Sequence, residues 1–140
     1  MPAITQLMSR NPVSVEPDDT LQVVKEIFDQ VKFHHILVVE HHVLIGVISD
    51  RDLFKALSPN LGTAAETTKD LATLKKRVHQ VMHRKPVTLP ITADVMDAVR
   101  VFNHEKVSCI PIVDQQKRPL GIISWRDIMR ALEKKEPKPA

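Results

Sequence analysis

The sequence predicts an α+β fold in which two β-α-β-β-α repeats pack about a pseudo-twofold axis. Three observations predict this fold. Residues recur along the chain at a nearly constant displacement, each half has the same order of apolar patterns, and two of the three glycines, Gly46 and Gly121, hold equivalent positions. A half of about 55 residues buries too little surface to be stable alone, so we expect the two halves to pack together.

The repetition is strongest in one segment. Residues 46–57 share seven of twelve identities with residues 121–132. The displacement also holds near the start of each half, where Met8 recurs as Met82. We therefore expect repeats at 1–57 and 78–134, a linker of a loop plus a helix over 58–77, and a loose tail over 135–140.

The first elements of each half are predicted by local patterns. Pro12 disfavours helix in the residue before it. The residues that follow it, 13–15, are expected to form a short extended segment. Apolar residues at three- and four-residue steps predict a helix from Leu21 to Val31, with Asp18 and Asp19 supplying its amino cap. In the second half, Thr92 is the expected cap of the corresponding helix.

The remaining elements follow the same reasoning. Runs rich in β-branched residues predict two strands in each half, at 35–39 and 43–48, and at 109–113 and 120–123. A second helix is expected to begin at Ser49 or Ser124. The linker helix is expected to contain a run of apolar residues at helical spacing: Leu71, Leu74, Val78 and Met82.

Composition excludes several classes of protein. With 43% hydrophobic and 26% charged residues in 140, the chain is neither disordered nor collagenous. Its net charge of +3 is scattered and it has no tyrosine, so we expect no nucleic acid partner. The densest apolar stretches, 36–39 and 43–48, are far shorter than the ~18 residues that cross a bilayer, and no secretory leader is visible. Cys109 is the single cysteine, so we expect a cytoplasmic protein without disulfides.

The candidate ligand-binding residues lie in the repeated segment. Its pattern is Gly-φ-φ-Ser-x-x-Asp, where φ is an apolar residue. The serine hydroxyl and the arginine before the aspartate can donate hydrogen bonds to a phosphate, as can free N–H groups at a helix start. An ionised aspartate can accept two hydrogen bonds from the adjacent hydroxyls of a ribose, and a glycine allows close approach of a base or sugar. The alternative interpretation is structural, because Ser49 with Asp52, and Ser124 with Asp127, have the spacing of a capping box.

These residues resemble a tandem CBS domain pair, or Bateman module. The likeness rests on the duplicated unit, the Met-x-x-x-Pro-Val lead-in and the paired Gly-φ-φ-Ser-x-x-Asp segment, and covers about residues 3 to 134. The resemblance implies a stand-alone regulatory module that binds adenosine ligands (AMP, ADP, ATP or S-adenosylmethionine) in clefts between the two repeats. It also implies a homodimer and an unidentified protein partner to which the ligand state is signalled, with no required cofactor.

The resemblance also assigns candidate residues. Two aspartates would hold ribose hydroxyls: Asp52 and Asp127. Four residues would face phosphate: Ser49, Arg51, Ser124 and Arg126. Eight would flank the base: Ser14, His35, Ile36, Val47, Thr88, Ile110, Pro111 and Ile122. The two halves differ where Asp50 corresponds to Trp125, so we expect the two sites to bind with unequal affinity.

Other functions are compatible with the same residues. A structural dimerisation module without ligand would need the serines and aspartates only as caps, and a sensor of S-adenosylmethionine or an NAD-type ligand would use the same residues. We expect no enzyme, since no nucleophile, metal cage or acid–base pair has adequate spacing. The histidines around 34–42 are expected to be surface residues without a metal, and Cys109 an inert core residue.

Overall fold

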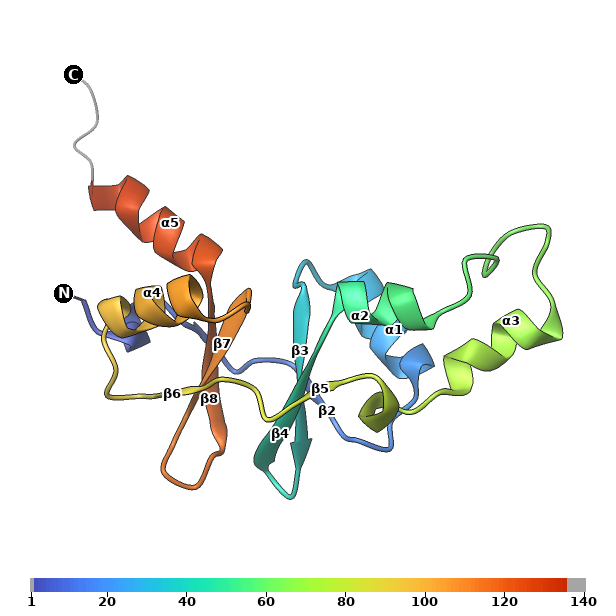
Figure 1. The fold of residues 1–140 in the computed structure, drawn as a ribbon, viewed down its shortest axis with the longest axis horizontal. Coiled ribbons are helices and arrows are strands. Elements are labelled where there is room, and N and C mark those ends of the chain that lie inside the picture. Colours follow the sequence, from blue (N-terminus) through green and yellow to red (C-terminus); the bar gives the residue numbers. More distant parts are fainter. Residues whose placement is uncertain (1, 136–140) are drawn as a thin grey trace. The chain divides into compact units, whose positions relative to one another are not determined.

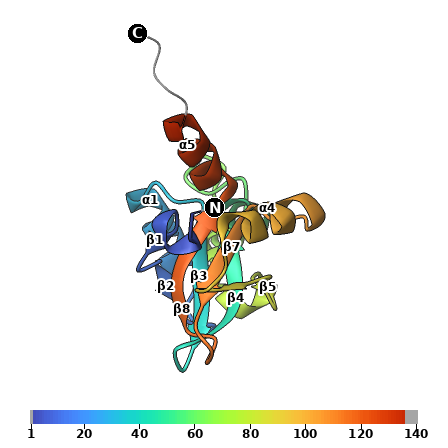
Figure 2. The same ribbon diagram turned by 90° about the vertical axis from the view of Figure 1, so that its left-hand side faces the viewer.

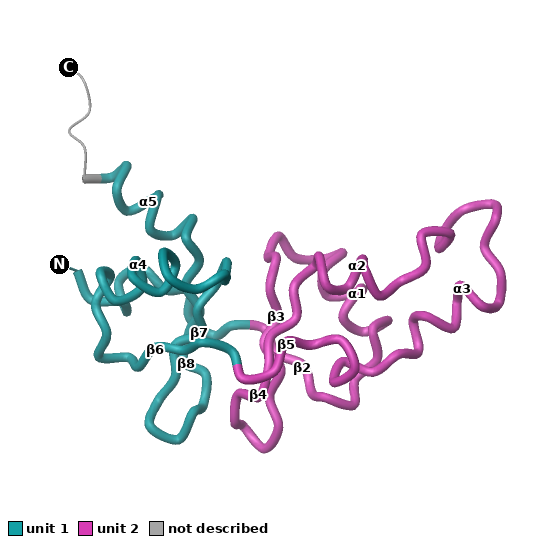
Figure 3. The backbone as a smooth tube through the Cα atoms, viewed as in Figure 1, with its two compact units in different colours: residues 1–12, 86–140 teal, residues 13–85 magenta. Residues whose placement is uncertain are grey.

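The computed structural model describes residues 2–135, and most of the expected loose tail therefore lies outside the described residues. The chain divides into two compact units, coloured separately in Figure 3. Unit 1 comprises Met1–Pro12 and Pro86–Ala140, and unit 2 comprises Val13–Lys85. The first twelve residues thus belong with the second half of the sequence, and residues 78–85 belong with the first half. The repeat boundaries given above are a division of the sequence and stay a prediction.

Unit 2 has a four-stranded sheet in the order β2-β3-β4-β5, in which β2 and β3 are parallel and the other neighbours antiparallel (Figure 1). The strands are β2 (Ser14–Val15), β3 (His35–Glu40), β4 (Val43–Ser49) and β5 (His83–Arg84). The helices are α1 (Leu21–Gln30), α2 (Asp50–Ala56) and α3 (Thr68–Ala72), with 3₁₀ turns η2 (Thr73–Lys75) and η3 (Val78–Gln80).

Unit 1 repeats this architecture with the sheet order β1-β8-β7-β6. Its strands are β1 (Ser9–Arg10), β6 (Leu89–Pro90), β7 (Cys109–Val113) and β8 (Pro119–Ser124). Its helices are α4 (Val95–His104) and α5 (Trp125–Lys135), with the 3₁₀ turn η1 (Ile4–Gln6). Both helices lie toward the end of the β7–β8 hairpin that is opposite its turn (Figure 2).

The predicted β-α-β-β-α order is confirmed in both units, as β2-α1-β3-β4-α2 and β6-α4-β7-β8-α5. Each sheet also has a short edge strand that the sequence patterns did not predict. β5 pairs with β4 in unit 2, and β1 pairs with β8 in unit 1. A strand of two residues has no alternation from which to predict it.

Each unit has its own hydrophobic core, formed where the helices cover one face of the sheet. In unit 2, Leu21 and Val24 of α1 pack with Ile36, Ile48 and Leu53, all of which are fully buried. The core of unit 1 is built from equivalent positions: Val95, Ala98, Ile110, Ile123 and Ile128. Burial does not alternate along β3: Ile36 and Val38 belong to the core, and Leu37, which points to the other face of the strand, is also fully buried.

The predicted helix caps were wrong by one or two residues. Thr20, not Asp18 or Asp19, caps α1, and its hydroxyl accepts a hydrogen bond from the Val23 N–H at 3.4 Å. Asp19 instead accepts a bond from the Glu16 N–H at 2.7 Å, which closes the preceding turn. In unit 1 the cap is Asp94 instead of Thr92, and it forms a capping box with Asp97.

The linker contains a helix, α3, but the apolar spacing of Leu71, Leu74, Val78 and Met82 predicted a longer one, which is broken into short pieces. Helix α3 ends at Ala72, and the backbone of Lys76 is extended, with φ −57° and ψ 148°. The break has a physical reason: the Leu21 N–H donates to the Lys76 carbonyl at 2.9 Å, and the Val78 N–H donates to the Asp19 carbonyl at 2.8 Å. These bonds tie the linker to the start of α1, and Val78 is fully buried in the core of unit 2.

Candidate functional site

The repeated Ser-x-x-Asp segment lies where a central strand passes into a helix. In unit 2, Ser49 is the N-cap of α2 and Asp52 is the third helical residue. The Ser49 N–H and hydroxyl donate to Asp52 Oδ2 at 2.9 and 2.8 Å, and the Asp52 N–H donates to the Ser49 hydroxyl at 3.0 Å. The capping interpretation is therefore correct for the geometry of this pair.

Unit 1 has the same arrangement at the start of α5. The Ser124 N–H and hydroxyl donate to Asp127 Oδ2 at 2.8 and 3.2 Å, and the Asp127 N–H lies 3.4 Å from the Ser124 hydroxyl. In both units the cap uses Oδ2 and leaves Oδ1 outside the capping box. A carboxylate oxygen in that position can still accept hydrogen bonds from another partner.

The second oxygen has different surroundings in the two units. In unit 2, His83 Nε2 lies 2.9 Å from Asp52 Oδ1. In unit 1, Asp127 Oδ1 has an ion pair with Arg130 Nη1 at 4.0 Å and no hydrogen bond within the described residues. His83 was not among the predicted site residues. No local pattern could have found it, because His83 reaches Asp52 from a segment 31 residues away in sequence.

The two effects on the pKa of Asp52 oppose each other. Burial raises the pKa of this carboxyl, but hydrogen bonds from Ser49 and His83, together with the charge interaction with His83, outweigh burial and hold the pKa below the usual aspartate value. The side chain is 15% exposed. Asp52 is therefore an ionised acceptor at neutral pH.

The two motif glycines have a structural explanation that the sequence interpretation missed. A Cβ on Gly46 would lie 2.7 Å from Met82 Sδ and 2.9 Å from the His83 carbonyl oxygen. A Cβ on Gly121 would lie 2.5 Å from Met8 Sδ. We expected these glycines to admit a ligand, but the atoms they admit belong to the lead-in segment that forms the edge strand.

The structure brings each set of predicted residues into one unit. Ser14, His35, Ile36, Val47, Ser49, Arg51 and Asp52 all lie in unit 2, and Thr88, Ile110, Pro111, Ile122, Ser124, Arg126 and Asp127 all lie in unit 1. Arg51 and Arg126 are exposed, as a phosphate contact requires. The side chains of Ile36 and Ile110 are fully buried in the cores. A ligand could reach only the backbone of these two residues.

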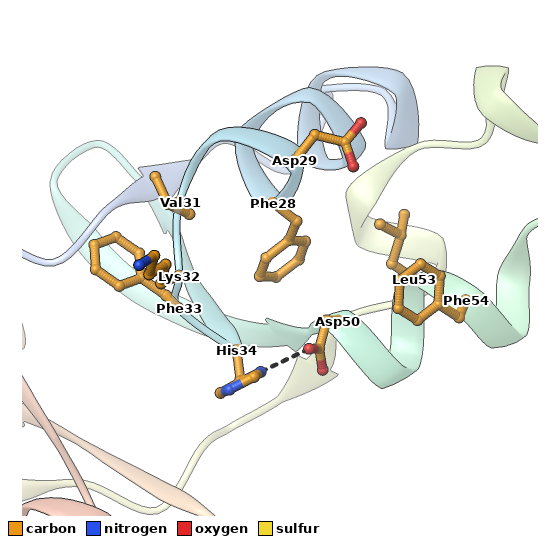
Figure 4. Close-up of a pocket in the computed structure, with 9 residues that line it drawn as sticks. All are labelled: Phe28, Asp29, Val31, Lys32, Phe33, His34, Asp50, Leu53 and Phe54. Atoms are coloured by element: carbon orange, nitrogen blue, oxygen red, sulfur yellow. Dashed lines mark hydrogen bonds and ion pairs between the residues drawn. The ribbon is translucent and has the colours of Figure 1, made fainter.

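Unit 2 also has a pocket on its helical side (Figure 4). It has a volume of about 390 Å³ and is walled by Phe28, Phe33, Leu53 and Phe54, with an ion pair of His34 and Asp50 at its edge, 2.8 Å between Nδ1 and Oδ2. None of the predicted ligand residues lines this pocket. It lies next to the Ser49–Asp52 motif and shares with it only Asp50, the residue that follows Ser49.

Position and burial bear on three other features: the cysteine, the possible metal ligands and the length of the helices. Cys109 is buried, and burial raises the pKa of its thiol to about 12, so it is no nucleophile at neutral pH. Across residues 2–135, no three His, Cys, Asp or Glu side chains lie close enough together to hold a metal ion. The helices of that same span are all too short or too polar to cross a bilayer.

Comparison with known proteins gives the family. The family model described as "CBS domain" matches the chain twice, at residues 4–59 and 78–134. A CBS domain-containing protein of Dictyostelium discoideum is 31% identical over 133 residues, which is 94% of this chain and 91% of that protein. The chain spans only 22% to 46% of the length of several larger curated relatives.

Solved structures agree with the fold. The AMP complex of CBSX2, a CBS-pair protein of Arabidopsis thaliana, has a TM-score of 0.78 at 24% identity and covers 97% of this chain and 100% of that chain. The CBS domain pair of protein MJ0100, in complex with 5′-methylthioadenosine and S-adenosyl-L-methionine, has a TM-score of 0.76 at 24% identity and covers 96% and 98% of the two chains. With its family model matched twice and its two β-α-β-β-α units in place, the chain belongs to the CBS domain family, as a CBS domain pair.

Proposed function

We propose that the chain is a regulatory module that binds adenosine nucleotides of the AMP, ADP and ATP class and signals their level to a partner protein. One observation carries the proposal: in both units a mostly buried aspartate is held by its serine through Oδ2, while Oδ1 lies outside the cap. A capped carboxylate has a fixed orientation, so a ligand that binds it does not first have to order the side chain.

Adenosine is the ligand class that the relatives support. CBSX2 has been crystallised with AMP, and the CBS pair of MJ0100 with 5′-methylthioadenosine and S-adenosyl-L-methionine. The adenosine group is common to these three molecules, whereas their 5′ substituents differ. We assign the ribose hydroxyls to Asp52 and Asp127 and the base to the neighbouring strands, including the backbone of Ile36 and Ile110.

The side chains near each aspartate favour an anionic 5′ group. Arg51 and Arg126 are exposed and precede the aspartates directly, whereas the hydroxyls of Ser49 and Ser124 already donate to those aspartates. A guanidinium binds phosphate more strongly than a neutral donor does. We therefore favour a nucleotide over S-adenosylmethionine, whose sulfonium is positively charged.

Signalling requires that the ligand bind two states of the protein with different affinity, since a ligand with equal affinity for both would shift neither population. We propose a homodimer as the signalling form and a separate polypeptide as its partner. Catalysis is no part of the proposal, because the thiol of Cys109 is buried and each aspartate already caps its own helix.

The second candidate is a structural dimerisation module without ligand, and the complete capping box of Ser49 and Asp52 favours it. Thermal unfolding with AMP, ATP, S-adenosylmethionine and NADH separates the two. A nucleotide at about 100 times its Kd stabilises the folded state by about 2.7 kcal/mol and raises the Tm. The double variant Asp52→Asn, Asp127→Asn is the matched control, since an amide oxygen can still accept the serine N–H. A Tm that none of the four ligands raises at millimolar concentration would favour the structural module.

A further inference from the structure

Asp52 and Asp127 offer their outer oxygens to different neighbours. Asp52 Oδ1 already has a hydrogen-bond partner, His83 Nε2, at 2.9 Å. The oxygen that the cap leaves over is therefore occupied in unit 2. Asp127 Oδ1 has only the long ion pair with Arg130, at 4.0 Å, among its described interactions.

The difference comes from one position of the edge strands. His83 lies opposite Val47 in the β4–β5 ladder, and Ser9 lies opposite Ile122 in the β1–β8 ladder. Val47 and Ile122 are equivalent, so the two ladders have the same register. A serine side chain is too short to make the contact that His83 makes. The same edge-strand position is therefore a histidine in unit 2 and a serine in unit 1, so the two units can be compared directly.

We propose that His83 competes with the ligand ribose for Asp52, which makes unit 2 the weaker of the two adenosine sites. This inference rests on the proposed function and adds to it the residue that sets the order of affinities. His83 is a positioning residue, because it acts through the carboxylate and not on the ligand.

The size of the effect follows from exposure. The His83 side chain is 73% exposed and the Asp52 side chain 15% exposed. A hydrogen bond with one largely exposed partner contributes little net stability, so we expect the displacement of His83 to cost a ligand a factor of roughly two to five in Kd. That factor is small enough to leave the site functional and large enough to measure.

Other charged groups of unit 2 also lie around this contact. His35 on β3 interacts with Asp52, Asp50 and His34. Arg84 follows His83 on β5 and donates to the His79 carbonyl at 3.0 Å. Arg51 precedes Asp52 on α2 and is exposed. All of these groups remain when His83 alone is replaced, so a comparison of variants isolates the His83 contribution.

Calorimetry with adenosine tests the proposal, because adenosine has no phosphate that an imidazolium could attract. Asp127→Asn removes the site in unit 1 and leaves the site in unit 2. In that background, His83→Ser should tighten adenosine binding about two- to five-fold near pH 7.5. The reciprocal change, Ser9→His in the background of Asp52→Asn, should weaken the unit 1 site by a similar factor.

Three results would overturn the inference. Equal Kd values with and without His83 would show that His83 does not compete. An unchanged affinity in the Ser9→His variant would show that the edge-strand position does not control the site. Wild-type protein that binds neither adenosine nor AMP would overturn the proposed function itself, and the inference with it.

Discussion

Gly46 and Met82 are in such close contact that a single methyl group does not fit between them. A Cβ built on Gly46 would lie 2.7 Å from Met82 Sδ. Gly121 and Met8 repeat the relationship at 2.5 Å. The glycine of the repeated motif and the methionine of the lead-in are therefore two parts of one packing contact, through which each edge strand reaches its sheet.

Alanine at either glycine should destabilise its unit. Overpacking of this kind typically costs 1–3 kcal/mol, because a neighbour must leave its preferred rotamer or the backbone must shift. We expect about 2 kcal/mol for Gly46→Ala in urea unfolding. The Met82→Ala background is the control, since it removes the sulfur but not the His83 carbonyl at 2.9 Å. If Gly46→Ala costs as much there as in the wild type, the contact with Met82 is not the reason for the glycine.

The position of the helix caps can be tested in unit 1. Asp94 caps α4, whereas Thr92 was the cap expected from the sequence. Asp94→Ala should cost about 1 kcal/mol, as the loss of an N-cap usually does. Thr92→Ala, an exposed change outside the cap, should stay within about 0.5 kcal/mol of wild type. A larger loss of stability from Thr92→Ala than from Asp94→Ala in chemical denaturation would contradict the assignment of Asp94 as the cap.

His35 should make the protein less stable in mild acid. Burial lowers the pKa of His35 and outweighs the attraction of Asp50 and Asp52. The unfolded chain then takes up the proton first as the pH falls. The stability that His35 contributes is present above about pH 6.5 and is lost as the pH falls through its folded pKa. Urea unfolding from about pH 7.5 to about pH 5 should show a shallower decline for His35→Gln than for wild type. Identical slopes would show that His35 is not the cause.

Asp114 should contribute to stability above about pH 4. Hydrogen bonds from the Arg118 N–H at 2.9 Å and from the Gln116 N–H at 2.9 Å lower the pKa of this carboxyl. A carboxyl whose pKa is lower in the folded state stabilises the fold above the unfolded pKa and loses this effect as the pH falls through the folded value. The free energy of unfolding of Asp114→Asn should fall less steeply than that of the wild type between about pH 5 and about pH 3. A curve parallel to that of the wild type would contradict this.

The sequence was sufficient to predict the repeated architecture, the strand pairs and the family, because these depend on periodic apolar patterns and on the duplicated motif. It was insufficient where a contact comes from a distant segment. The linker helix breaks because Leu21 and Asp19 bond to the linker backbone, and no local pattern encodes that pairing. The caps at Thr20 and Asp94 differ from the predicted ones because several acceptors compete within one turn.

The candidate site was also predicted only in part from the sequence. Ser49 and Asp52 were predicted together because they are three residues apart in a repeated segment. His83 was not, because it reaches Asp52 from a lead-in strand 31 residues away in sequence. The roles assigned to the site residues remain proposals that ligand binding has to test.

The most direct test of the central proposal is the stoichiometry of AMP binding in titration calorimetry. We predict two binding events per chain for wild type, one for Asp52→Asn, one for Asp127→Asn and none for the double variant, with the Tm of each variant close to that of wild type without ligand. Wild-type stoichiometry in the double variant, or no AMP binding by wild-type protein at millimolar concentration, would contradict the proposal that these two carboxylates hold the ribose.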